Sequence, residues 1–179
     1  QFNIQVDDVD DDRPIPFSDY GIASFIVELA GLELMPHSVN FFLQMVDAKV
    51  WDNTVFNHGV NHILYSELKD IDGGDRNDQL DDADIPKHLS FPEYTNQYQH
   101  NKYTIGFGSR PGGPGFYINL HDNAHTHGPG GQKEHTLHEE ADPCFGAVVE
   151  GQHVIDWMEI KNQKGQEGYT AINSIRIIK

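Results

Sequence analysis

Histidine is the residue type whose number and placement in this sequence most suggest chemistry. The chain has 11 histidines among its 179 residues, and several lie close together between acidic side chains. Imidazole and carboxylate groups together suit zinc, copper, nickel or iron. The candidate ligands for a transition metal are His121, His125, His127, His135 and His138.

Two other interpretations of this histidine cluster stay open, because its spacings match no strong metal-binding motif. A solvated loop can carry such polar residues with no ligand at all. Alternatively, clustered histidines gain positive charge below neutral pH and can act as a pH sensor.

The remaining polar motifs predict little chemistry. The acidic stretch 70–84 lacks the register and the final glutamate of an EF-hand calcium loop. Gly112–Gly115 is expected to form a turn, since no helix follows it to bind phosphate. Cys144 is the only cysteine, which excludes an internal disulfide.

Composition narrows the class of partner. The formal net charge is −16, from 28 acidic and 12 basic residues, so the surface should repel nucleic acid and anionic lipid. No apolar run is long enough for a membrane helix. We therefore expect no nucleic acid partner and no membrane insertion.

The chain begins with Gln1 rather than Met, which favours a processed or truncated start. On that interpretation a targeting segment was removed upstream. We expect a soluble protein, with an organelle lumen or the secretory pathway as one destination and the compartment left open.

Apolar periodicity predicts short strands and two helices. Residues 22–29 alternate as a strand does, whereas 36–49 and 151–161 follow helical spacing, the first beginning at Pro36. Further strands are predicted at 51–56, 103–107, 116–120, 144–149 and 172–178. This pattern favours a closed antiparallel β structure capped by helices.

Two polar stretches interrupt this pattern. The first 19 residues are dense in aspartate and predict an acidic N-terminal extension, followed by one domain at 20–179. Residues 67–103 form a long acidic excursion, and loops of that length in a compact domain are usually functional or mobile.

Three stretches together resemble the cyclophilin family of peptidyl-prolyl cis-trans isomerases. They are residues 25–56, containing Met-Pro-His-Ser-Val-Asn-Phe-Phe and Trp-Asp-Asn-Thr-Val-Phe; residues 113–118, Gly-Pro-Gly-Phe-Tyr-Ile; and residues 144–155, Cys-Phe-Gly-Ala-Val-Val-Glu-Gly-Gln-His-Val-Ile. The resemblance implies a mainly β fold, an eight-stranded antiparallel barrel capped by two α-helices. It implies no required cofactor.

The reaction that the resemblance implies is rotation about an Xaa–Pro bond, which amide resonance opposes with a barrier of roughly 18–20 kcal/mol. The family is understood to use an apolar proline pocket and an arginine near the prolyl nitrogen. Here His58 falls at the arginine position; a shift of one residue would place Asn57 or Gly59 there instead. A neutral imidazole has one donor, whereas a guanidinium has five and a permanent charge.

The other pocket positions are also altered. Ser66 and Gly115 fall at two glutamine positions, Tyr117 at a pocket phenylalanine, and Asp142 near a pocket histidine. The candidate substrate-binding residues are Ile63, Leu64, Ser66, Gly115, Phe116, Tyr117 and Asp142. The resemblance also places His58 and His62 across the groove from the histidine cluster.

These residues support three hypotheses. The first is a cyclophilin-like domain with weak or no isomerase activity that binds a proline-containing peptide or protein, or acts as a subunit of a larger complex. The second is an active isomerase that assists folding, which the apolar pocket positions favour. The third is a metal-binding protein that uses the histidine-rich loop.

Overall fold

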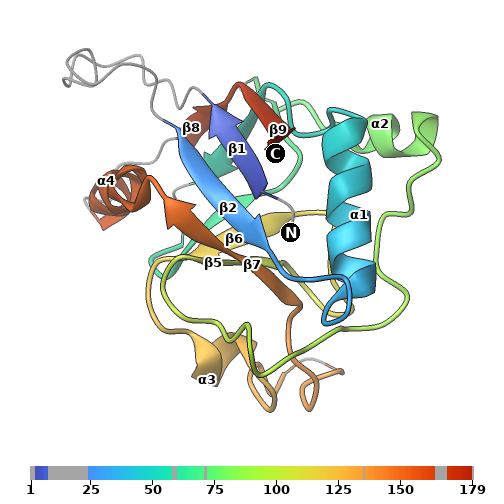
Figure 1. Cartoon of the computed structure of the whole chain (residues 1–179), viewed down its shortest axis with the longest axis vertical. Helices are drawn as coiled ribbons and strands as arrows, with labels where there is room; N and C mark the ends of the chain where they lie inside the picture. Colours follow the sequence, from blue (N-terminus) through green and yellow to red (C-terminus); the bar gives the residue numbers. More distant parts are fainter. Residues whose placement is uncertain are drawn as a thin grey trace.

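A single curled antiparallel sheet dominates the described part of the chain (Figure 1). The computed structural model describes residues 3–7, 24–57, 60–70, 72–134, 136–163 and 169–178. Within them, nine strands follow the order β8-β3-β4-β6-β5-β7-β2-β1-β9. The strands are β1 (Asn3–Asp7), β2 (Phe25–Leu29), β3 (Thr54–Asn57), β4 (Ile63–Ser66), β5 (Thr104–Phe107), β6 (Phe116–Asn119), β7 (Cys144–Glu150), β8 (Tyr169–Ile172) and β9 (Ser174–Ile178).

The mainly β fold class is confirmed, with differences in detail. The expected strand at 172–178 is two strands, β8 and β9, which Asn173 separates. The ninth strand is β1, which lies in the predicted acidic extension and pairs with both β2 and β9. The two strands at the ends of the order, β8 and β9, are joined by a single residue, so the two edges of the sheet lie near each other. The sheet therefore curls toward a closed barrel.

The two predicted helices are present as α1 (Pro36–Asp47) and α4 (Gln152–Gln163). Pro36 occupies the first turn of α1, where its missing N–H costs nothing. Two short helices, α2 (Asn77–Asp82) and α3 (Ala124–His127), also lie within the described residues. In Figure 1, α1 and α4 lie on opposite sides of the strands, and α3 lies below them.

Aromatic side chains fill the interior between α1 and the sheet. The ring of Phe42 lies 5.2–6.1 Å from those of Trp51, Phe107, Phe116 and Phe145. Such packing fixes which face of each strand points inward, since core side chains tolerate few arrangements.

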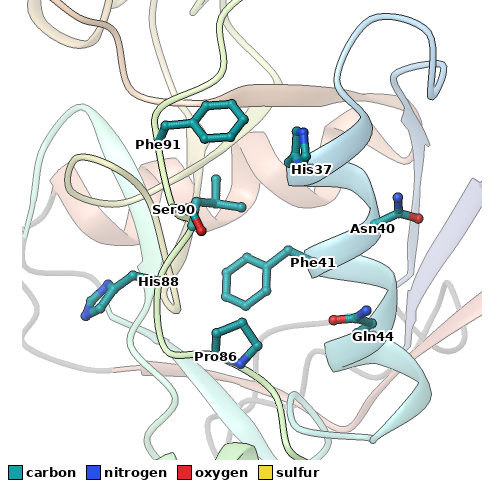
Figure 2. A pocket seen from close by; sticks show the side chains of 9 residues that line it. His37, Asn40, Phe41, Gln44, Pro86, His88, Ser90 and Phe91 are labelled. Carbon is teal, nitrogen blue, oxygen red and sulfur yellow. The ribbon is translucent and has the colours of Figure 1, made fainter.

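The acidic excursion is anchored to the core rather than free of it. Leu68, Leu80, Ile85 and Leu89 are buried in the same cluster as α1. Between α1 and residues 86–91 a pocket of about 200 Å³ remains (Figure 2).

In the described part of the chain, no helix is long and apolar enough to cross a membrane.

Candidate functional site

Strand alternation divides the candidate substrate-binding residues between two faces. On β6, Phe116 belongs to the core cluster, whereas Tyr117 points to the opposite face. On β4, Leu64 and Ser66 pair with the inward residues Ile118 and Phe116. Leu64, Ser66 and Phe116 therefore lie in the interior, and the Ser66 hydroxyl has no hydrogen-bond partner among the described residues.

Ile63, Gly115 and Tyr117 lie on the outer face of the sheet. Tyr65 shares this face because it pairs with Tyr117. Its ring covers Gly115 so closely that a Cβ added there would meet the Tyr65 hydroxyl at 2.5 Å. A glutamine at this position is thus incompatible with the present arrangement of Tyr65.

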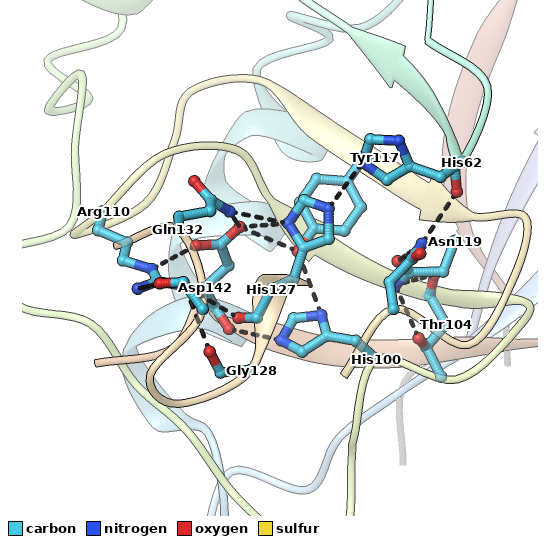
Figure 3. A network of polar contacts seen from close by, with 12 residues as sticks. His62, His100, Thr104, Arg110, Tyr117, Asn119, His127, Gly128, Gln132 and Asp142 are labelled. Carbon is cyan, nitrogen blue, oxygen red and sulfur yellow. Dashed lines mark hydrogen bonds and ion pairs between the residues drawn. The ribbon is translucent and has the colours of Figure 1, made fainter. Parts of the chain in front are cut away.

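The side chain of Tyr117 is covered by other residues of this chain. Tyr117 is only 1% exposed, and its ring centroid lies 4.8 Å from that of His127 (Figure 3). Its hydroxyl is 3.2 Å from His100 Nδ1 and 3.4 Å from Asp142 Oδ2. Burial, and then the Asp142 charge, raise the pKa of Tyr117 well above its usual value.

Asp142 is the centre of the buried network over Tyr117. Its Oδ2 atom accepts hydrogen bonds from His127 Nδ1 at 2.7 Å and from Gln132 Nε2 at 3.2 Å. Its Oδ1 atom accepts one from Arg110 Nε at 2.6 Å. Burial alone raises the pKa of this carboxyl, but the bonds from His127 and Arg110 outweigh burial and lower it.

Arg110 is committed to its own chain. Its side chain is 2% exposed, and besides Asp142 it donates to backbone carbonyls of the loop between His127 and His138. The acceptors are Gly131, Leu137 and His138 for Nη1, and His127 and Gly128 for Nη2. The guanidinium therefore holds this loop against the sheet and presents no donor to a substrate.

His100 completes the buried network. Its Nε2 atom lies 3.1 Å from the Asp142 carbonyl oxygen, so this nitrogen carries the hydrogen and Nδ1 accepts from the Tyr117 hydroxyl. Burial, followed by the neighbouring His127, lowers the pKa of His100 to about 4. The ring is therefore neutral at physiological pH.

His62 joins the network from the partly exposed side. Its Nε2 atom lies 3.1 Å from His127 Nε2, and its carbonyl accepts a hydrogen bond from Asn123 Nδ2 at 2.9 Å. Burial and the neighbouring His127 lower the pKa of His62. Of the rings of His62, His100 and His127, only that of His62 is partly exposed.

The predicted metal ligands do not converge as a set. His127 is buried, His121 and His125 are exposed, and the carbonyl of His138 is held by Arg110. His135, the fifth predicted ligand, lies outside the described residues, as does His58, the residue predicted at the catalytic arginine position. Among the residues that are described, no group of three or more His, Cys, Asp or Glu side chains is arranged to hold a metal ion.

Beside this closed network lies an open groove of about 730 Å³. Tyr65, Gly115 and Pro114 form its apolar wall, and the acidic excursion forms the rest. The charged lining residues are Glu67, Lys69, Asp75, Asp78 and Lys87. Lys69 pairs with Glu67 at 2.7 Å, and Lys87 with Asp81 at 2.9 Å.

The family model for cyclophilin-type peptidyl-prolyl cis-trans isomerases (Cyclophilin type peptidyl-prolyl cis-trans isomerase/CLD) matches residues 19–179. The chain belongs to this family. A cyclophilin-type isomerase of Cryptosporidium parvum is similar in structure, with a TM-score of 0.63 and 14% identity over 100% of this chain and 99% of that one. The same values hold for its structure in the presence of the dipeptide Ala-Pro. No curated protein matches by sequence.

Sequence reasoning did not single out Arg110, His100 or Gln132 as part of this cyclophilin's site. One signal for Arg110 was available: it is the only Lys or Arg between Lys102 and Lys133. A lone cation in a Gly/Pro-rich connection needs an acidic partner once it is buried. Which acid it meets, however, depends on contacts far apart in sequence.

Proposed function

We propose that this cyclophilin domain binds a segment of a partner protein and catalyses prolyl isomerisation weakly or not at all. The observation that carries the proposal is the cover over Tyr117, the position that the resemblance assigns to the proline pocket. His127 lies on its ring, and Asp142 and Arg110 secure His127.

The cost of uncovering Tyr117 supports weak catalysis. A proline ring can reach Tyr117 only if His127 leaves the Asp142 carboxylate, and a hydrogen bond to a charged group contributes about 1.5–3 kcal/mol. Since 1.4 kcal/mol corresponds to a factor of ten, opening the pocket lowers substrate affinity by about 10- to 100-fold. Arg110 supplies no replacement for the family arginine, because its donors are already in use.

The open groove supports peptide binding and indicates the chemistry of the peptide. Tyr65 and Pro114 offer apolar contact for a proline ring, whereas Glu67, Asp75 and Asp78 add acidic side chains to the lining. The lysines of the groove are paired with carboxylates, so the uncompensated charge is negative. A segment with proline next to lysine or arginine complements this surface, as the net charge of −16 also favours.

Charge reversal in the groove tests this binding. We expect proline-containing peptides with flanking lysines to bind the full chain, and the Asp78→Lys variant to weaken their affinity at least about fivefold through lost attraction. The control, Glu139→Lys, makes the same charge change at an exposed residue outside the groove and should have less effect. Equal binding of acidic and basic peptides, as measured by calorimetry, would contradict the proposal.

A second function, an active isomerase that assists folding, is favoured by membership of the family. On that alternative the covered pocket opens readily and His58 contributes the donor. Turnover of an Xaa–Pro peptide near that of an ordinary cyclophilin, abolished by His58→Ala, would support it. Weak turnover that His58→Ala leaves unchanged would support the binding role.

A further inference from the structure

Two imidazole rings face each other at the edge of the buried network. His62 directly precedes β4, and His127 ends α3, so the two come from distant parts of the chain. Their Nε2 atoms lie 3.1 Å apart, with ring centroids 5.3 Å apart (Figure 3). This juxtaposition joins a partly exposed ring to one that is buried.

The hydrogen bond behind His127 determines which of its nitrogens is free to act as a ligand. Asp142 accepts from Nδ1 at 2.7 Å, so the hydrogen of His127 sits on Nδ1 and the lone pair on Nε2. A carboxylate that holds the far nitrogen of a histidine in this way is the usual support for a metal-binding imidazole. Arg110 in turn holds the carboxylate at 2.6 Å.

The separation of the two Nε2 atoms suits a shared ion. Metal–nitrogen bonds of 2.0–2.1 Å at angles between 90° and the tetrahedral value place two ligating nitrogens roughly 2.9–3.4 Å apart. The observed 3.1 Å lies within that interval. Because His62 Nε2–H donates to the His127 Nε2 lone pair in the structure, binding an ion requires the His62 hydrogen to move to Nδ1 and this partly exposed ring to turn.

We propose that His62 and His127 bind one divalent transition-metal ion through their Nε2 atoms, with Asp142 orienting the His127 ring and water completing the coordination. This site differs from the five-histidine loop that the sequence suggested, because only His127 is common to both. It is also independent of the peptide groove, so its failure would leave the proposed function untouched.

The ligand number predicts the affinity and the choice of metal. Because the described residues provide no third ligand, binding should be in the micromolar range, well short of a structural zinc site. Two imidazoles and water favour Cu²⁺ over Zn²⁺ and Ni²⁺ by the usual order of stability. The acidic surface adds attraction for any cation.

The test uses the full chain without an affinity tag, stripped with EDTA and titrated with Cu²⁺. We expect a dissociation constant in the micromolar range and an electron paramagnetic resonance spectrum showing coupling to two imidazole nitrogens. His62→Ala should weaken binding at least about tenfold and remove one coupled nitrogen. Because His62 is at the surface side of the network, this variant should fold, and circular dichroism checks that it does.

The matched controls are His121→Ala and His125→Ala, which remove exposed histidines of the same loop. Both should bind Cu²⁺ as the unchanged chain does. Binding that survives His62→Ala, binding that is lost in either control, or a dissociation constant above about 1 mM would each overturn the proposal.

Discussion

Asp142 accepts hydrogen bonds from His127 and Gln132, which lie in one loop, and from Arg110 in the connection between β5 and β6. The resemblance to cyclophilins places a pocket histidine near this position. An acid here, once buried, requires positive or hydrogen-bonding partners. The guanidinium and the imidazole meet this requirement, and the imidazole also covers the Tyr117 ring.

His100 makes the stability of this network depend on pH. Its folded pKa of about 4 lies below the ordinary 6.5, so its contribution is complete above pH 6.5 and is lost as pH falls from 6.5 toward 4. Over this whole pH range the loss in the free energy of unfolding is about 3 kcal/mol. Asp142, whose pKa is lowered below 3.8, stays ionised between pH 7 and 5.

We predict that the unchanged chain loses about 2 kcal/mol more of its free energy of unfolding between pH 7 and pH 5 than the His100→Gln variant does. The measurement is urea denaturation at each pH, with EDTA present to remove metal ions. The exposed His153 provides the control, since His153→Gln should keep the full pH dependence. A His100→Gln variant with the same pH dependence as the unchanged chain would show that His100 is not held neutral by burial.

At the level of elements, Glu93 links the acidic excursion to the start of α1. Its carboxylate accepts hydrogen bonds from the backbone N–H and the hydroxyl of Ser38 at 2.6 and 2.7 Å, and from His37 N–H at 3.1 Å. These backbone donors have no partner within the helix, and the helix dipole also favours a negative charge there. The excursion is therefore part of the fold.

Removing this cap should destabilise the protein. Glu93→Ala leaves the donors of Ser38 and His37 without their acceptor, and we expect a loss of about 1–2 kcal/mol in the free energy of unfolding. Glu93→Gln, which keeps an acceptor oxygen, should lose less. The exposed Glu139→Ala is the control, and equal thermal midpoints for Glu93→Ala and Glu139→Ala would refute the role of the cap.

Elements with strong local periodicity could be predicted from the sequence, whereas the site could not be fully predicted. The burial of Phe25, Val27 and Leu29 on β2 follows from alternation alone. The face on which Leu64 and Ser66 lie depends on how β4 pairs with β6. A shift of the strand register by one residue would move both side chains to the other face of the sheet. Family resemblance supplies positions, but not which face of a divergent strand they occupy.

On the scale of the whole molecule, the chain has the curled sheet of a cyclophilin, and Tyr117 on its outer face is covered by other residues of the same chain. The ion pair between Arg110 and Asp142 joins residues that are distant in sequence. No local sequence pattern indicates such a pair, so it could not be predicted without the fold. Strand β1 is a similar case, because its partners β2 and β9 lie far along the chain. Membership of a larger complex and the compartment stay predictions.

The rate of Xaa–Pro isomerisation tests the central claim, that the proline pocket is closed by this chain's own side chains. The measurement is exchange spectroscopy on an Ala-Pro peptide with catalytic amounts of the full chain, beside an ordinary cyclophilin under the same conditions. We predict a kcat/KM lower by about 100-fold or more, which His58→Arg alone does not restore because His127 still covers Tyr117. A kcat/KM within tenfold of the ordinary cyclophilin would contradict the account.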